Sequence, residues 1–159
     1  MIKRKKKNTK PLVSIIMNCH NGEEFVRQSL KSIKQQTYKN WELIFWDNRS
    51  TDNSEKIIKS YFDKRIRYFK SKKFLNLYSA RNLAIKKAKG KYISFLDVDD
   101  LWKKNKLEKQ VSYLKKNKDL KIVYSNFTTI NDVKNKKYIY HKNLLPYGHI
   151  TQKLLNNYQ

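Results

Sequence analysis

The chain has 159 residues, of which 39% are hydrophobic and 13% aromatic, with 37 Lys and Arg against 13 Asp and Glu. This length and apolar content are enough for one domain with a buried core, and they exclude an intrinsically disordered chain despite a formal net charge of +24. Such a charge attracts nucleic acid, anionic membrane surfaces or phosphorylated small molecules. Part of it reflects a composition rich in Lys, Asn, Ile and Tyr, which A/T-rich codons encode, and solvated helix faces.

The amino terminus is mostly basic over residues 1–10, and we expect it to form a disordered arm. The arm is not followed by the h-region of a signal peptide, and no apolar run approaches the roughly 20 residues of a membrane-spanning helix. The single cysteine, Cys19, cannot form an intramolecular disulfide and fits a reducing compartment, so we expect a cytoplasmic protein. The arm is interpreted either as a tail without function or as a peripheral contact with an anionic membrane or polyanion.

The first predicted strand and helix follow the arm. Residues 12–18 form a continuous β-prone apolar run, which is typical of a parallel strand buried on both faces. A helix is predicted over 23–36, with acidic residues in its first turn where the helix dipole favours them. Helical spacing predicts that its inner face is lined by Phe25, Val26, Ser29, Leu30 and Ile33.

A second apolar run, 41–47, predicts the next strand, and it ends on a carboxylate. The helix expected over 52–62 has Ser50 or Thr51 as its N-cap, because a short side-chain oxygen there can accept from a free backbone N–H. Residues 66–69 predict a short third strand.

A third helix is expected over 78–89, with Gly90 as its C-cap. Its predicted inner face consists of Ala80, Leu83, Ala84, Ile85 and Ala88. The strand predicted over 91–96 runs directly into the acidic stretch 97–100.

Beyond the acidic stretch, a helix is predicted over 101–117, with apolar residues on one side. A strand over 121–130 is expected to turn and pair with 137–141 as a hairpin. A short helix is expected over 149–157. No repeat and no second domain is indicated, so we expect residues 11–159 to form a single domain.

Strand and helix alternate three times within the first hundred residues, which predicts an α/β fold with a mostly parallel sheet flanked by helices. Ligands of such sheets bind at the carboxyl ends of the strands, near the switch in strand order. Residues 18–20, Asp47 and 97–99 all fall at those ends. The sequence therefore predicts one site built from three separate segments.

The acidic stretch Asp97-Val98-Asp99-Asp100 has two interpretations. If the strand continues through it, Asp97 and Asp99 lie on the same side, and two hard oxygen ligands suit Mg²⁺ or Mn²⁺ carrying substrate phosphates. Alternatively, Asp100 caps a helix that begins near Trp102, and its neighbours only form a turn.

Several other chemistries are excluded. Only three glycines occur in the chain, so the Gly-rich phosphate loops of dinucleotide-binding folds and P-loop NTPases are absent. The three histidines lack zinc-ligand spacing, one cysteine cannot build a zinc site, and there is no serine nucleophile elbow.

Asp47 and Arg81 are further candidate site residues, each with a structural alternative. Asp47 resembles in position an acidic residue that ends a second strand and accepts hydrogen bonds from a nucleoside, or it simply starts a turn. Arg81 stands early in a helix of small residues, where its guanidinium could pair with a phosphate or the acidic stretch, or lie at the surface with a packed stem.

Taken together, the motifs resemble the donor-binding part of family 2 glycosyltransferases of the GT-A fold, a Rossmann-like architecture. The resemblance covers most of the chain up to Trp102 and keeps the order and spacing of the family. It rests on five segments, namely 13–22, 35–44, 47–54, 80–85 and 90–100.

The resemblance implies a nucleoside pocket. Asp47 would contact the base of a nucleotide-sugar, usually uridine, while Asn18 and His20 would line the same pocket. Arg81 would lie near the base or the phosphates. His20 replaces a frequent Tyr of the family; it could still stack on a base, although the base preference is then less defined.

The resemblance also implies a diphosphate site. Asp97 would bind ribose or the sugar, and Asp99 would coordinate the Mn²⁺ or Mg²⁺ that bridges the diphosphate, as in the family's DxD motif. These roles imply a metal-dependent transferase that uses a UDP-sugar and glycosylates a glycan, lipid or protein acceptor.

The part of the chain that would bind the acceptor departs from the family pattern. Inverting members use a later Asp or Glu to deprotonate the acceptor hydroxyl, and Glu108, Asp119 and Asp132 do not match that motif. We therefore expect a truncated GT-A domain that lacks most of the acceptor-binding half. It is either a minimal transferase that borrows acceptor elements from a second copy in a homodimer or from a partner subunit, or a fragment. The alternative is a nucleotide-sugar-binding pseudoenzyme or subunit. Nucleic-acid binding is disfavoured, because no such motif is present and the basic residues are scattered.

Overall fold

The computed structural model describes residues 10–131 and 136–139, and the chain divides into two compact units, Met1–Lys109 and Gln110–Gln159. Each unit is described by itself. The arm predicted at 1–10 lies outside the described residues apart from Lys10, and so does the helix predicted over 149–157. The expectation of a single domain over 11–159 stays a prediction.

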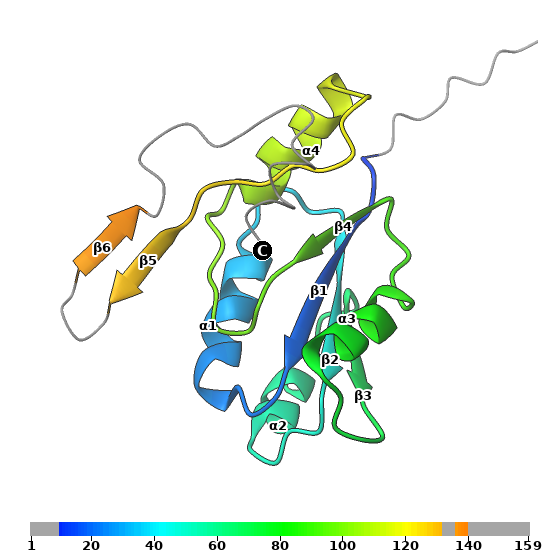
Figure 1. Ribbon diagram of the computed structural model, residues 1–159, viewed down its shortest axis with the longest axis vertical. Coiled ribbons are helices and arrows are strands. Elements are labelled where there is room, and N and C mark those ends of the chain that lie inside the picture. Colours follow the sequence, from blue (N-terminus) through cyan, green and yellow to red (C-terminus); the bar gives the residue numbers. More distant parts are fainter. Residues whose placement is uncertain (1–9, 132–135, 140–159) are drawn as a thin grey trace, which may run out of the picture. The chain divides into compact units, whose positions relative to one another are not determined.

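The first unit alternates strands and helices as the sequence predicts (Figure 1). Its elements are β1 (Val13–Cys19), α1 (Glu23–Lys34), β2 (Trp41–Asp47), α2 (Ser54–Lys59), β3 (Ile66–Lys70), α3 (Leu77–Ile85) and β4 (Tyr92–Phe95). The boundary between the units falls inside α4 (Lys106–Lys116). The second unit holds β5 (Thr128–Asn131) and β6 (Lys136–Ile139).

The four strands of the first unit form one sheet in the order β3-β2-β1-β4, and every neighbouring pair is parallel. The strands β1 and β2 pair in register from Val13 opposite Trp41 to Cys19 opposite Asp47. The α/β class with a parallel sheet flanked by helices is therefore confirmed. Because β1 leads to β2 on one side and has β4 on the other, the strand order switches next to β1.

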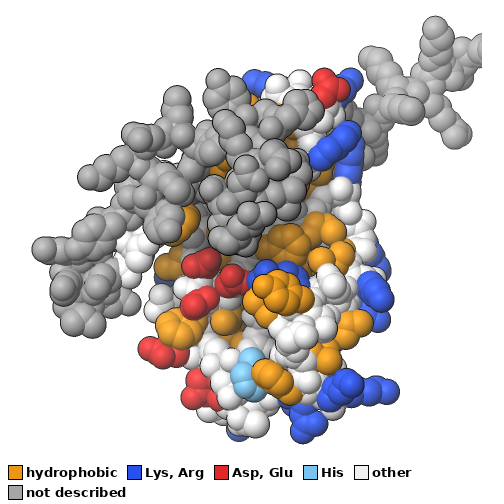
Figure 2. Space-filling model, in the orientation of Figure 1, with side chains coloured by type: hydrophobic (Ala, Val, Ile, Leu, Met, Phe, Trp, Pro, Cys, Tyr) orange, Lys and Arg blue, Asp and Glu red, His pale blue; other side chains and the backbone are white. Residues whose placement is uncertain are grey.

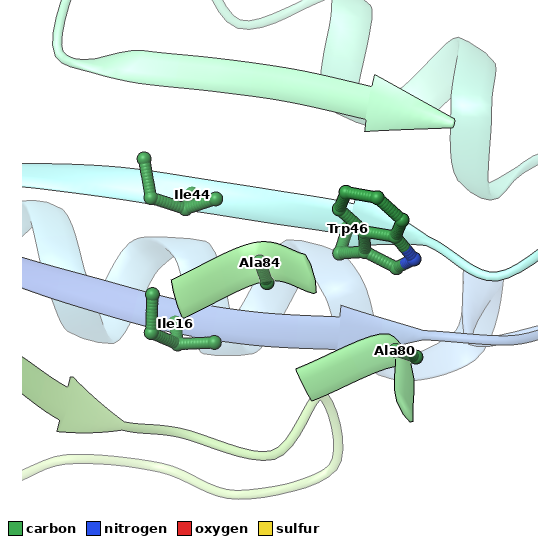
Figure 3. Close-up of a cluster of buried hydrophobic side chains, with 5 residues drawn as sticks. All are labelled: Ile16, Ile44, Trp46, Ala80 and Ala84. Carbon is green, nitrogen blue, oxygen red and sulfur yellow. The ribbon is translucent and has the colours of Figure 1, made fainter. Parts of the chain in front are cut away.

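Under α3, one face of the sheet packs against small side chains (Figure 3). Ala80 and Ala84 project from α3 towards Ile16 of β1 and the side chains of β2, and all are buried. A side chain no larger than a methyl group lets the helix approach the sheet closely, which fills the space without a cavity. The inner face predicted for this helix is right for the two alanines and wrong for Leu83, which is 37% exposed at the flank of the stripe.

The helix α1 buries Val26, Leu30 and Ile33, as the helical spacing predicts. The prediction that Phe25 belongs to this face is wrong, because its side chain is 41% exposed. Phe25 lies at the edge of the apolar stripe, one residue before the fully buried Val26.

Caps and turns differ most from the sequence prediction. The helix α2 begins at Ser54 with Asn53 at its N-cap, and no side chain caps it there. Ser50 is not the cap, because its hydroxyl accepts a hydrogen bond from the Asn21 N–H at 3.0 Å. Asp52 Oδ1 instead accepts from the Ser54 N–H at 2.9 Å, so a carboxylate satisfies this end of the helix.

Gly90 is also not a helix cap, because α3 ends at Ile85 with Lys86 at its C-cap. The glycine is needed for space. A Cβ on Gly90 would lie 2.6 Å from the Ser14 backbone nitrogen and 2.9 Å from the Leu12 carbonyl oxygen. The Gly90 N–H donates to Ser14 Oγ at 2.8 Å, so the chain crosses β1 at close range before it enters β4.

The segment between β4 and α4 is not helical, so Asp100 does not cap a helix that starts near Trp102. The backbone is instead held by Gln36, which is fully buried. Its Nε2 donates to the Lys103 carbonyl at 2.9 Å, and its Oε1 accepts from the Leu107 N–H at 3.1 Å. These hydrogen bonds fix the path of the backbone and delay the start of the helix.

The second unit contains an antiparallel hairpin of β5 and β6, in which Thr128 lies opposite Ile139. The predicted hairpin is confirmed, although β5 is shorter than the strand expected over 121–130, because 121–127 have no regular secondary structure. Within the described part of the chain, no helix is both long enough and apolar enough to cross a bilayer.

Candidate functional site

Three loops meet at the carboxyl edge of the sheet because β1, β2 and β4 are parallel neighbours around the switch in strand order. These are residues 20–22 after β1, 48–53 after β2 and 96–100 after β4. Two backbone positions in the first two loops, Asn21 and Arg49, have left-handed φ values of 52° and 64°. Such values are uncommon outside glycine and mark sharply turned segments.

The loops after β1 and β2 are joined by side-chain hydrogen bonds. The Gly22 N–H donates to Ser54 Oγ at 3.0 Å, and the Thr51 N–H donates to Asn21 Oδ1 at 2.8 Å. The Asn48 N–H also donates to the Cys19 carbonyl at 2.7 Å. Each loop therefore satisfies the free backbone groups of the other, which makes this end of the sheet rigid.

Asp47 is fully buried beneath the second loop, and both of its carboxylate oxygens accept hydrogen bonds. Oδ1 accepts from the Ser50 N–H at 2.7 Å, and Oδ2 accepts from the Tyr68 hydroxyl at 2.7 Å. Asp47 therefore stabilises the loop after β2 through the hydrogen bond from the Ser50 N–H. Its predicted contact with a base stays a prediction.

Burial and the charge of Asp47 raise the pKa of Tyr68 well above its usual value. Tyr68 therefore stays a neutral donor to Asp47 over the whole physiological range. Burial likewise raises the pKa of the Cys19 thiol, against weaker lowering by hydrogen bonds with Ser54 and Ser50. Cys19 packs as a neutral side chain and is a poor nucleophile.

Asn18 lies next to the last residue of β1, and its side chain has unused hydrogen-bonding capacity. Neither Oδ1 nor Nδ2 is accessible to solvent, and within the described residues neither has a hydrogen-bond partner. Its register partner in β2 is Trp46, whose Nε1 is likewise buried and unpaired there. Buried amides are nearly always paired, so this position calls for a water or a ligand.

His20 is exposed and lies at the rim of the same edge. Its Nδ1 lies 3.1 Å from the Asn48 carbonyl oxygen, and its ring meets Phe74 edge-on with centroids 4.8 Å apart. Asn48 in turn bonds Leu75 twice, at 2.8 and 3.1 Å, which draws the loop before α3 towards His20. The two rings together form an aromatic wall.

The acidic turn follows β4, which ends at Phe95. The Asp100 N–H donates to the Asp97 carbonyl at 3.0 Å, so these carboxylates belong to a turn. The prediction that strand alternation places Asp97 and Asp99 on one side therefore loses its basis. Val98 anchors the turn, because its methyl carbons lie 3.0 and 3.1 Å from where a Cβ on Gly22 would stand.

Arg81 is paired with the acidic turn, one of the alternatives that the sequence left open. Its Nη2 donates to Asp97 Oδ1 at 2.7 Å, and its guanidinium lies 5.4 Å from the Phe95 ring centroid. The carboxylate is 57% exposed and the guanidinium side chain 27% exposed, so a ligand can reach the pair. Figure 2 shows carboxylate side chains gathered on one face with hydrophobic ones beside them.

The acidic turn concentrates negative charge. Burial, followed by the charges of Asp99 and Asp97, raises the pKa of Asp100. Among the described residues no three His, Cys, Asp or Glu side chains converge on one point. Mg²⁺ and Mn²⁺ prefer hard oxygen and often take one or two carboxylates plus substrate phosphates, so this donor set fits such an ion.

No general base is identified beyond the turn. Glu108 Oε2 accepts from the Thr37 hydroxyl at 2.7 Å, which links α4 to the segment after α1. Asp119 is exposed in the second unit, and Asp132 lies outside the described residues.

Comparison with known proteins identifies the family. The pattern described as Glycosyl transferase family 2 matches residues 14–158, nearly the whole chain. The chain belongs to this family. The chain is 41% identical over 121 residues to UDP-Glc:alpha-D-GlcNAc-diphosphoundecaprenol beta-1,3-glucosyltransferase WfgD of Escherichia coli. This alignment covers 76% of the chain and 47% of WfgD. The chain spans less than half the length of WfgD and of two further curated relatives that it matches.

Two solved structures share the fold of this family 2 chain. TarS 1–349 of S. aureus, solved with UDP-GlcNAc, has a TM-score of 0.63 at 22% identity, covering 71% of this chain and 37% of that one. The mannosyltransferase PcManGT of Pyrobaculum calidifontis, solved with GDP-Man and Mn2+, has a TM-score of 0.62 at 23% identity, covering 67% and 33%.

Sequence reasoning missed several contributors to this edge of the family 2 domain. Tyr68 carries no motif, and only its β3 register opposite Phe45 of β2 brings it near Asp47. Phe74 was not singled out, since nothing in a loop sequence indicates a ring contact with a histidine 54 positions earlier. The alternation within β3 is the one signal that could have pointed to Tyr68.

Proposed function

We propose that this chain forms the donor-binding part of a metal-dependent glycosyltransferase that uses a nucleotide-diphospho-sugar, with UDP as the nucleotide. The observation that carries the proposal is the convergence at one sheet edge of the unpaired Asn18 amide and the exposed Arg81–Asp97 pair. Membership of family 2 supports it, as do the UDP-glucose named for WfgD and the UDP-GlcNAc complex of TarS. PcManGT was solved with GDP-Man, so the base is the least supported element.

The nucleoside would lie over the loops after β1 and β2. His20 and Phe74 supply a wall against which a base can pack, and the Asn18 amide offers both a donor and an acceptor to a polar group. Asp47 holds the loop beneath by accepting from the Ser50 N–H, and each of its oxygens keeps a lone pair with which it would contact the base. The rigidity of both loops reduces the ordering cost of binding.

The diphosphate would lie towards the acidic turn. Asp99 would hold Mn²⁺ or Mg²⁺, whose Lewis acidity stabilises the negative charge of the departing diphosphate. Asp97 is held by Arg81 in the position from which it would bind ribose or the sugar. Arg81 also offers further N–H donors to a phosphate without leaving the carboxylate, since a guanidinium carries five.

The acceptor is proposed to be a hydroxyl of a glycan, a lipid or a protein, supported by the lipid-linked sugar acceptor named for WfgD. The residues that bind and deprotonate it are proposed to come from a second copy of the chain or a partner subunit. A donor-binding protein without transfer activity is the second candidate, favoured by the lack of a matching general base among the described residues.

The deciding experiment is a thermal scan of the 159-residue chain with UDP and Mn²⁺. Ligand at about 100 times its dissociation constant should add roughly 2.7 kcal/mol to the free energy of unfolding, and Asp99→Ala should abolish the gain. Asp119→Ala, an exposed carboxylate of the second unit, is the matched control and should keep it. No stabilisation of the wild type by any nucleotide with Mn²⁺ would overturn the proposal.

Product analysis then separates the two candidates. Release of UDP from a UDP-sugar that requires added acceptor lipids or glycans would establish transfer, because hydrolysis by water releases UDP without them. Binding of the UDP-sugar without release of UDP, with the chain alone present in excess, would establish a donor-binding subunit.

A further inference from the structure

A basic groove lies between α1 and the end of α2, away from the candidate donor site. It is shallow, has a volume of about 400 Å³, and is lined by Arg27, Gln28, Lys31, Lys34, Gln35 and Tyr61. The cations recur at i, i+4 and i+7 and so form one stripe along α1, beside the buried stripe of Val26 and Leu30. The lining side chains include no carboxylate, and the nearby Asp63 feels the charge of Lys34, which contributes to lowering the pKa of Asp63 after the hydrogen bonds from Arg65.

Aromatic side chains accompany these cations. Lys34 Nζ lies 5.4 Å from the Tyr61 ring centroid, so the tyrosine is part of the groove wall. The next residue, Phe62, has a relative exposure of 101%, which leaves its entire side chain in water. An isolated apolar ring of this size gains free energy wherever an apolar phase accepts it.

We propose that the groove and Phe62 form a docking surface for an anionic membrane. The cations would contact lipid phosphates, and Phe62 would enter the boundary between headgroups and acyl chains. A nucleic-acid duplex would satisfy the charges but offers no apolar phase for an exposed phenylalanine. The proposal stands on this surface alone and does not rest on the proposed donor specificity.

The position of the groove suits such a role. The helix α1 starts beside the candidate site at Glu23 and reaches Lys34 eleven residues later, a rise of about 16 Å. Lys34 is therefore the groove cation farthest along α1 from the carboxyl edge of the sheet. Charged contacts of this kind fall with ionic strength, whereas the contribution of Phe62 does not.

The test is co-sedimentation of the full chain with phosphatidylcholine vesicles, with and without about a third phosphatidylglycerol. We expect binding only to the anionic vesicles. The double variant Lys31→Gln, Lys34→Gln should weaken it about thirtyfold, because each cation near the surface contributes roughly a factor of five. The matched variant Lys86→Gln, Lys89→Gln removes the same charge beyond the end of α3, from exposed positions, and should lose less than twofold.

Phe62 gives an independent arm. Phe62→Ser should weaken binding about tenfold, and Phe62→Trp should retain it, because tryptophan favours the same boundary. All variants should keep the melting temperature of the ligand-free wild type to within about 2 °C, which reports folding without involving the donor site. Equal losses from both lysine pairs, wild-type binding by Phe62→Ser, or tighter binding to an oligonucleotide than to anionic vesicles would overturn the proposal.

Discussion

Arg81 and Asp97 form an ion pair at the mouth of the candidate site, with Nη2 2.7 Å from Oδ1. The guanidinium offsets part of the repulsion among the carboxylates of the acidic turn, where Asp99 and Asp97 both contribute to the raised pKa of Asp100. The same positive charge opposes a metal ion and attracts a diphosphate. Arg81 should therefore affect the two ligands in opposite directions.

Arg81→Gln is expected to bind Mn²⁺ alone several-fold more tightly than the wild type and UDP with Mn²⁺ several-fold more weakly. The reason is electrostatic, since loss of the cation deepens the negative potential at Asp99 while removing a phosphate donor. Calorimetric titration measures both affinities. Lys89→Gln removes a charge from an exposed position outside the site and is the control; parallel changes in both affinities would contradict the assignment.

Tyr68→Phe is expected to lower the free energy of unfolding by about 1–3 kcal/mol, because the buried Asp47 Oδ2 loses its donor. Urea denaturation measures the change, and Tyr78→Phe, at a tyrosine that is 77% exposed, should leave it nearly unaltered. The raised pKa of Tyr68 adds a pH dependence. Its contribution is complete below pH 10, the usual tyrosine value, and declines as the pH rises further.

At the scale of elements, hydrogen bonds between residues close to the start of a strand fix where that strand begins. Before β3, Asp63 Oδ1 accepts from the Arg65 N–H at 3.0 Å and Oδ2 from Arg65 Nη2 at 2.7 Å. The Arg65 hydrogen bonds lower the pKa of Asp63 from 3.8 to about 2, against a smaller effect of burial. Gly90 plays the corresponding part before β4 through its close approach to Ser14.

Asp63→Asn keeps an oxygen acceptor for the Arg65 N–H, but it removes the charge and the Oδ2 acceptor of Arg65 Nη2. The lowered pKa means that the native state binds the proton less readily than the unfolded chain, so the stabilisation is present above pH 3.8 and lost as the pH falls to about 2. The variant should be less stable than the wild type at neutral pH, by about 1 kcal/mol or less since the pair faces solvent. The difference in the free energy of unfolding between variant and wild type should vanish near pH 2. Chemical denaturation at several pH values measures it, and a difference that does not change with pH would contradict the prediction.

Gly90→Ala is expected to destabilise the first unit by about 1–3 kcal/mol, because the new methyl group would overlap the Ser14 backbone nitrogen, 2.6 Å away. Lys89→Ala, its exposed neighbour, should cost much less. Thermal unfolding compares the two. A Gly90→Ala protein as stable as the wild type would show that the crossing over β1 has room to relax.

At the scale of the whole molecule, the net charge of +24 sets the solution behaviour. Self-repulsion of so many like charges destabilises a compact chain, and salt screens it beyond about 10 Å at 0.1 M. We expect the melting temperature to rise by a few degrees when potassium chloride increases from about 0.01 to 0.15 M. The few surface ion pairs weaken in the same range, and a falling melting temperature would show that they outweigh the repulsion.

The sequence by itself determined the α/β class, the strands β1 to β4 and the three segments that meet at the carboxyl edge. It could do so because apolar periodicity follows the backbone, and parallel strands bring all their carboxyl ends to one side. The tertiary structure decided which partner each side chain has. Asp47 lies beneath its loop because Tyr68, 21 positions later, donates to it, and Asp97 is claimed by Arg81, 16 positions earlier.

Phe25, Gly90 and Asp100 show the same limit, since their surroundings come from elements distant in the chain. Helical spacing cannot tell where the buried stripe ends beside Phe25, and the exposed side chain lies at its edge. A glycine after a helix suits a cap, yet Gly90 is required by the backbone of β1 across the sheet. A local pattern fixes the conformation of a segment, whereas the distances between segments fix what its side chains can bind.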